Sequence, residues 1–196
     1  MAICHSDSNR IIMLITEDRL RQTFSEGGAQ EIYQKVKSTG DFLGFARQYA
    51  FSQDYRVARS ALWGLTKASK EELSQLQVTL YELIDLAMQT ENSSVRRLTL
   101  NIIERLEIKE DELRTDFLDF CLDHMADVSE FPGIQSICMK LAYRMCSFYS
   151  ELMDELKRTL EAMEILCLSC ERLWLNLELR QADDLHQSDI PPSVAR

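Results

Sequence analysis

Three apolar segments of this chain can be laid over one another at an almost constant spacing. Within each segment the apolar residues recur every three or four positions, which is the spacing of one face of an α-helix. The segments begin at Val57, Val95 and Ile134, so the repeat length is 38 residues and then 39 residues. A repeat of this length predicts an all-α fold in which helical units stack on one another.

The second segment, residues 92–108, shows how such a helix is built. Asn92, Ser93 and Ser94 offer side-chain oxygens for the N-cap. The apolar arc of the helix consists of Leu98, Thr99, Leu100, Ile102, Ile103 and Leu106. The remaining polar wedge is narrow and consists of Arg97, Asn101, Glu104 and Arg105. A helix with so little polar surface is covered on three sides, as an inner helix of a stacked array is.

Longer and more acidic helices are predicted between and after these segments, at residues 71–88, 111–127 and 150–164. The unit is therefore a pair of antiparallel helices. One such pair cannot bury its own apolar face, so it must stack on its neighbours.

The sequences of the three segments resemble the second helix of a HEAT repeat. DYRVARSALWGL (54–65) and SSVRRLTLNII (93–103) partly reproduce its Asp, Val-Arg and small-residue pattern, whereas PGIQSICMKLAYRM (132–145) lacks the Asp and the Arg. The resemblance extends from residue 41 to about residue 164. It implies a short, right-handed α-solenoid with helix pairs at about 41–68, 71–107, 110–147 and 150–165.

The ends of the chain are predicted to differ from this array. Residues 1–12 show no periodicity and are expected to form a disordered leader, and residues 13–165 one HEAT-like domain. Within that domain, a short helix starting at Thr16, carrying Leu20 and Phe24 and ending at Gly27-Gly28, is expected to form a capping pair with the next helix. Residues 166–196 are an atypical C-terminal extension, expected to be partly disordered.

The composition predicts a globular chain that works in the cytoplasm without spanning a membrane. Of the 196 residues, 45% are hydrophobic, while 6 glycines and 3 prolines leave little room for a sheet-rich fold. The apolar run Ile11 to Ile15 is too short for a signal peptide or a membrane span. The six cysteines have no regular spacing, which indicates reduced thiols and not a disulfide framework.

The net charge of −10 conceals an alternation between the two classes of helix. Residues 71–88, 110–127 and 149–164 sum to −4, −6 and −3, whereas residues 54–68, 92–107 and 132–147 sum to +2, +1 and +2. In HEAT-like arrays the second helices line the concave side, so the resemblance implies a basic inner groove and an acidic outer face. Such a groove can attract an anionic ligand even on an acidic protein.

A helical wheel places ten side chains of the second helices in this groove. They are Arg56, Arg59, Trp63 and Lys67; Arg97, Asn101 and Arg105; and Lys140, Tyr143 and Arg144. We expect the cations to bind carboxylates or phosphates, and the two aromatic residues to supply apolar contact area. The predicted function is a non-enzymatic scaffold that binds an acidic segment of another protein. The alternative is a solvated face with Trp63 covered by the N-terminal helices.

Two other functions remain open at this point. The chain is similar to HEAT-like DNA alkylation-repair glycosylases in the cations around Trp63 and Tyr143, with Glu104 as the only acid of the wedge. The second possibility is an oligomerisation module, in which acidic outer helices of one chain meet basic inner helices of another.

No catalytic residue, cofactor or metal is expected. The spacings of Cys121 with His124 and of Cys167 with Cys170 permit a zinc site, but Cys121 falls in an apolar register that favours a core position. Phosphate-binding glycine loops and histidine-activated nucleophiles are also missing from the sequence.

Overall fold

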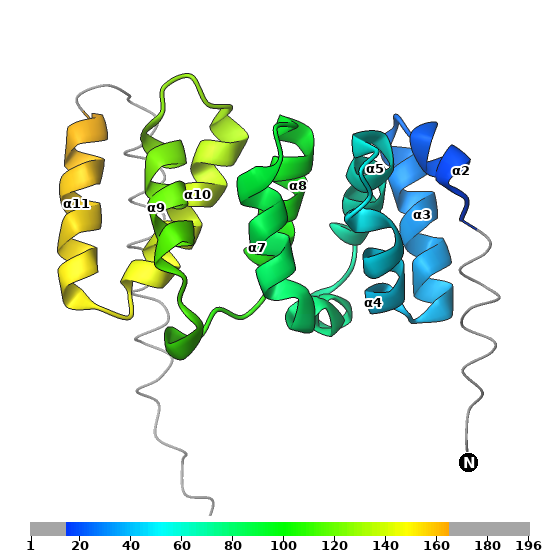
Figure 1. Cartoon of the computed structure of the whole chain (residues 1–196), viewed down its shortest axis with the longest axis horizontal. Helices are drawn as coiled ribbons and strands as arrows, with labels where there is room; N and C mark the ends of the chain where they lie inside the picture. The colour runs from blue at the N-terminus through cyan, green and yellow to red at the C-terminus, as the bar shows by residue number, and fades with distance from the viewer. Residues whose placement is uncertain (1–14, 165–196) are drawn as a thin grey trace, which may run out of the picture. The chain divides into compact units, whose positions relative to one another are not determined.

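The structure is a computed structural model that describes residues 15–164, and the regular secondary structure of this part of the chain is all helical, without a strand (Figure 1). The chain divides into two compact units, Met1–Met145 and Cys146–Arg196. The described helices of the first unit are α2 (Glu17–Arg21), α3 (Glu26–Thr39), α4 (Phe42–Phe45), the π-helix η1 (Ala46–Ala50), α5 (Tyr55–Leu65), α6 (Lys70–Leu73), the 3-10 helix η2 (Ser74–Thr79), α7 (Leu80–Gln89), α8 (Ser93–Ile103), the 3-10 helix η3 (Glu110–Glu112), α9 (Thr115–Ala126) and α10 (Pro132–Cys146, whose last residue belongs to the second unit).

The helices of the first unit form antiparallel pairs that stack, as the repeat predicts (Figure 1). The π-helix η1 packs against α5, and α7 packs against α8. The loop 127–131 joins α9 to α10. Neighbouring pairs meet through like helices, since α5 also packs on α8, and α7 on α9. The predicted all-α solenoid class is confirmed.

Side-chain caps fix where several of the helices begin. Thr16, Asp41 and Asn92 accept backbone N–H bonds at the starts of α2, α4 and α8, at the positions that the sequence predicts. Ser69 forms a reciprocal capping box with Glu72 at the start of α6. These caps are local in sequence, which is why the sequence locates them well.

The N-terminal pair departs from the prediction. The first helix, α2, ends at Arg21, and Ser25 caps α3 by accepting a bond from the Gly28 N–H. The predicted end at Gly27-Gly28 is therefore wrong, because both glycines lie inside the first turn of α3. Phe24 falls between the helices and is exposed, not inward.

The long first helices are also less regular than predicted. The segment 71–88 consists of α6, the 3-10 helix η2 and then α7. In the segment 111–127 the α-helix begins only at Thr115 and ends at Ala126. Ser74 and Thr79 donate side-chain bonds to carbonyls three residues earlier, which favours the tighter turn of η2.

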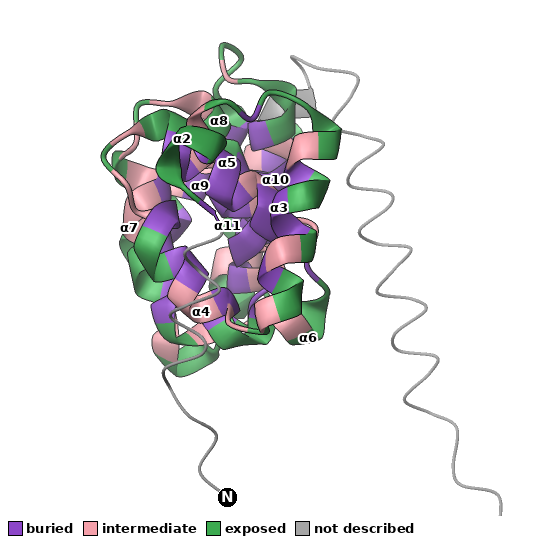
Figure 2. Cartoon of the chain, turned by 90° about the vertical axis from the view of Figure 1, so that its right-hand side faces the viewer, coloured by how far each residue is buried: buried purple, intermediate pink, exposed green. Residues whose placement is uncertain are grey.

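The core lies on the inward sides of the helices, and Figure 2 shows exposed residues on their outer sides. As predicted, α8 is covered on three sides, because all six residues of its apolar arc are at most 5% exposed. The close contact of α3 with α5 depends on Gly64, where a Cβ atom would come within 2.6 Å of Ile32 Cγ2.

The second unit is described through residue 164 and contains α11 (Ser150–Glu164). Leu156 and Leu160 of this helix are buried, while Glu151 and Asp154 are exposed. The predicted leader 1–12 and the extension 166–196 lie outside the described residues.

Candidate functional site

The candidate site is the surface presented by α5, α8 and α10, here called the second-helix face. Neighbouring second helices are held in register by two arginines. Arg105 donates to the carbonyl oxygens of Thr66, at 3.1 Å, and of Ala68, at the end of α5. Arg144 donates in the same way to Glu104 and, at 2.8 Å, to Leu106, just after α8. Donor and acceptor are 37–40 residues apart in every case, so the contact repeats once per repeat.

We call these two contacts the arginine clasps. A helix leaves its last carbonyl groups without intrahelical partners, and a guanidinium group satisfies two of them at once. The Arg144 side chain is half-buried, and burial lowers the pKa of its guanidinium group. Arg105 and Arg144 were predicted as ligand-binding residues, and in the structure their guanidinium groups bond to carbonyl groups of the preceding repeat.

The α5 part of the face contains Arg59, Trp63 and Lys67 at successive turns. Arg59 donates to the carbonyl oxygen of Thr23 at 2.8 Å. Lys67 forms an ion pair with Glu26. Trp63 is half-buried.

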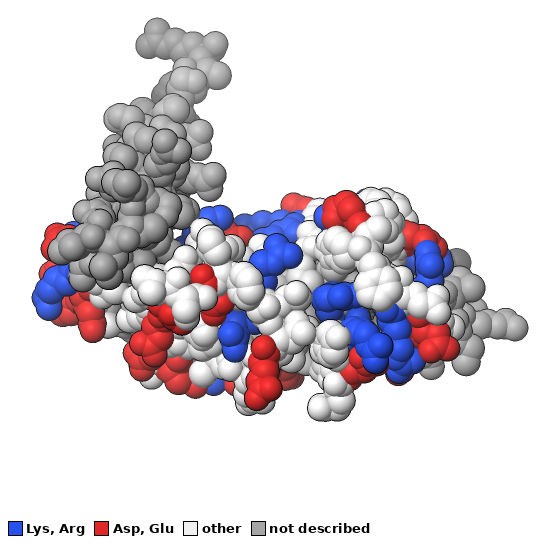
Figure 3. Space-filling model, turned by 90° about the horizontal axis from the view of Figure 1, so that it is seen from above, with Lys and Arg blue, Asp and Glu red and all other residues white. Residues whose placement is uncertain are grey.

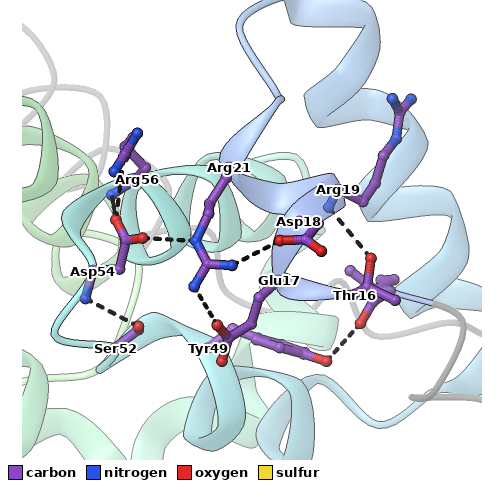
Figure 4. A network of polar contacts seen from close by, with 10 residues as sticks. Thr16, Glu17, Asp18, Arg19, Arg21, Tyr49, Ser52, Asp54 and Arg56 are labelled. Atoms are coloured by element: carbon purple, nitrogen blue, oxygen red, sulfur yellow. Dashed lines mark hydrogen bonds and ion pairs between the residues drawn. The ribbon is translucent and has the colours of Figure 1, made fainter.

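Arg56, the fourth predicted residue of α5, belongs to a different cluster at the start of that helix. Its Nε lies 3.4 Å from Asp54 Oδ1, and Asp54 Oδ2 accepts a 2.8 Å bond from Arg21 Nε (Figure 4). Arg21 also pairs with Glu17 and Asp18. The hydrogen bond from Arg21 holds the pKa of the Asp54 carboxyl below its usual value, with the N–H of Arg56 adding to the effect. The cations at this end are balanced by carboxylates.

The α8 part of the face contains Arg97 and Asn101. Asn101 donates to the carbonyl oxygen of Arg97 at 3.0 Å. Arg97 is exposed, and within residues 15–164 its side chain makes no hydrogen bond or ion pair. A Cβ atom on Gly133 of α10 would lie 3.3 Å from Arg97 Cδ, so the aliphatic part of this side chain runs beside α10.

The α10 part contains Lys140 and Tyr143 in addition to Arg144. Lys140 Nζ lies 3.9 Å from Glu104 Oε1, and Tyr143 is half-buried. Glu104, the acid that a glycosylase-like reaction would need, is thus beside a lysine.

A pocket of about 480 Å³ lies next to the clasps. It is lined by Lys70, Glu104, Arg105, Leu106, Glu107 and Arg144. Its two arginines already bind carbonyl groups, and its carboxylates offset its cations.

The α5 and α8 helices are packed neighbours, and the Arg105 side chain bonds to carbonyl groups that follow α5. Basic and acidic side chains also occur close together on the surface, where Figure 3 shows separate blue groups with red groups beside them. The charge alternation of the sequence therefore translates into local groups of cations in this view.

The helical wheel missed Phe24, which is 72% exposed and has the Arg59 guanidinium 5.3 Å from its ring centroid. The only signal in the sequence is its position between Thr23 and Ser25, two residues that commonly flank helix ends.

The proposed zinc ligands do not converge in the described part of the chain. No group of three or more His, Cys, Asp or Glu side chains that could hold a metal occurs there. Cys121 is buried, and His124 Nδ1 lies 2.7 Å from Glu130 Oε2. Cys167 and Cys170 lie outside the described residues.

Comparison with protein families gives one match. The model of the HEAT repeat domain matches residues 16–171, and this family generally provides protein-interaction scaffolds and is typically non-enzymatic. No curated protein and no solved structure matches the chain. Between residues 15 and 164, no helix combines the length and the apolar character needed to cross a membrane. Since the match covers well over half of the sequence and agrees with the stacked helix pairs, the chain belongs to the HEAT repeat domain family.

Proposed function

We propose that this protein is a non-enzymatic scaffold that binds an acidic segment of another protein on its second-helix face. The centre of the proposed site is formed by Arg59, Trp63, Lys67, Arg97 and Asn101, with Lys140 and Tyr143 extending it along α10. The buried free thiols of Cys138 and Cys146 support a cytoplasmic setting for this role.

One observation supports the proposal: a half-buried tryptophan lies on α5 one turn after Arg59 and one turn before Lys67, which follows the end of that helix. Arg97 lies on α8, the helix that packs against α5. Tryptophan and arginine are the residues that most often dominate the binding energy of protein interfaces. Guanidinium groups also match carboxylates with paired hydrogen bonds.

The local charge favours an anionic partner. Within residues 15–164, Lys67 pairs with Glu26 and Lys140 Nζ lies 3.9 Å from Glu104 Oε1, whereas Arg59 and Arg97 form no ion pair. The ion pair of Lys67 with the exposed Glu26 is a surface pair, which contributes little to stability and can be exchanged for a pair with a ligand. The chain as a whole has a net charge of −10, which disfavours a nucleic acid.

Arg97→Glu tests the proposal, because its guanidinium group makes no polar contact within residues 15–164 that folding would lose. The matched control is Arg47→Glu, the same charge change at an exposed residue of η1. The probe is a fluorescent designed peptide of alternating Glu and Ser, titrated at low salt. We expect Arg97→Glu to weaken binding by about tenfold or more, and Arg47→Glu by less than about twofold.

Equal affinities for the two variants would refute the proposed site. Tighter binding of a DNA duplex than of the peptide by the unmodified protein would favour the nucleic-acid function. Arg105→Glu is unsuitable for this test, because loss of its clasp would change the fold and the surface together.

A further inference from the structure

Phe24 is an exposed phenylalanine on a rigid support. The Thr23 hydroxyl donates to the Arg19 carbonyl oxygen at 2.9 Å, and the Thr23 carbonyl oxygen accepts the bond from Arg59. On the other side, Ser25 is held as the N-cap of α3. Thr23 is 3% exposed, whereas Phe24 is 72% exposed. The backbone therefore fixes the position of a large apolar side chain that the core does not use.

Arg59 joins this side chain to the second-helix face. Its guanidinium carbon lies 5.3 Å from the centroid of the Phe24 ring, within the range of a cation–π contact. Trp63 follows one turn later on the same helix, on the same side. Phe24, Arg59 and Trp63 thus present two aromatic surfaces next to one positive charge.

Arg59 also has unused hydrogen-bonding capacity. Its bond to the Thr23 carbonyl oxygen uses Nη2, and Nε is buried without a hydrogen-bond partner among the described residues. A guanidinium group has five N–H donors, and a buried donor without a partner is unfavourable. A carboxylate that approaches the group from outside can use its remaining donors.

We infer that Phe24, Arg59 and Trp63 form an anchor for one large apolar side chain that is flanked by carboxylates in the bound segment. The inference rests on the proposed function and specifies its partner: an acidic segment of another protein with an apolar residue among the acids. The apolar side chain packs on Phe24 and Trp63, and a neighbouring carboxylate binds Arg59. Arg59 and the exposed Arg97, which form no ion pair within residues 15–164, are complementary in charge to such a segment.

Two designed peptides test this inference. Both contain the same number of Glu residues, and one has a central Leu where the other has Ser. We expect the unmodified protein to prefer the Leu peptide by about tenfold, in line with the burial of one apolar side chain. In Phe24→Ala the preference should fall to about twofold or less, with the affinity for the Ser peptide unchanged.

Phe131→Ala is the matched control, because Phe131 is a phenylalanine that is 61% exposed in the loop before α10. It should keep the full preference, and the melting temperatures of both variants should stay at that of the unmodified protein. The inference is overturned by equal binding of the two peptides, by a preference that survives Phe24→Ala, or by the same loss in Phe131→Ala. Self-association that Phe24→Ala abolishes would also overturn it, by assigning the anchor to a second copy of the chain.

Two results distinguish a failure of this inference from a failure of the proposed function. If Arg97→Glu weakens both peptides while Phe24→Ala changes neither, the second-helix face binds acidic segments without the anchor. If Arg97→Glu changes neither affinity, the proposed function itself is wrong.

Discussion

Asp54 combines two roles in one carboxylate. Its Oδ1 accepts the N–H of Arg56 at 3.0 Å and so caps α5, and its Oδ2 accepts Nε of Arg21 from α2 (Figure 4). Asn92 occupies the equivalent position before α8 and caps that helix with a neutral amide. A helix cap at this position therefore needs only a side-chain oxygen, whereas the contact with Arg21 is strengthened by the negative charge of Asp54.

Asp54→Asn should reveal the charged contribution through its pH dependence. Arg21 lowers the pKa of Asp54 in the folded protein, so the ionised carboxylate stabilises the fold above the ordinary pKa of an aspartate. This stabilisation is lost as the pH falls through the lowered pKa. Urea unfolding at several pH values should show a destabilised variant near neutral pH and a difference that disappears in acid. A difference that stays constant with pH would show that Asp54 acts only through its cap.

The arginine clasps are the main device at the scale of elements. Each one connects the second helix of a repeat to the end of the preceding second helix, through two carbonyl groups. Lys67 is the residue of the first repeat in the same register, and it pairs with Glu26 of α3 instead. The N-terminal pair therefore ends the array with an ion pair where later repeats use a clasp.

Arg105→Ala should destabilise the protein by about 1–3 kcal/mol, because two carbonyl groups in a partly buried position lose their partner. Arg97→Ala is the control: it removes an exposed arginine without a clasp and should change stability by less than about 0.5 kcal/mol. Chemical denaturation measures both values. Equal stabilities of the two variants would mean that the clasp contributes nothing to the stacking of repeats.

The sequence predicts what is local and periodic in this fold. The register of Val57, Val95 and Ile134 indicated the second helices, and Asn92 indicated the start of α8. These features depend on residues within one or two turns, so spacing and cap chemistry suffice.

Features that depend on distant groups could not be predicted in the same way. The helical wheel placed Lys67, Arg105 and Arg144 in the same register. It could not show that Arg105 and Arg144 donate hydrogen bonds to carbonyl groups of the preceding repeat. Nor could it detect Phe24, because exposure there depends on how Thr23 is held by Arg59, 36 residues later. Side-chain bonds within η2 likewise interrupt the helix that periodicity predicts at 71–88.

In the first unit, the proposed binding site depends on the stacking of helix pairs. Stacking places α5 and α8 side by side, and we propose that cations of both helices bind the ligand together with Trp63. Neither α5 nor α8 contains this group of side chains alone. The binding of an acidic segment should therefore involve at least two repeats, and it should weaken as salt screens the charges.

Hydrogen–deuterium exchange tests this claim most directly, with and without the acidic Leu peptide. The account predicts slower exchange in α5 and α8, residues Tyr55–Leu65 and Ser93–Ile103, and no change in η1 or α7. Slower exchange in η1 and α7, with α5 and α8 unchanged, would show that the ligand binds the first helices and would contradict the account.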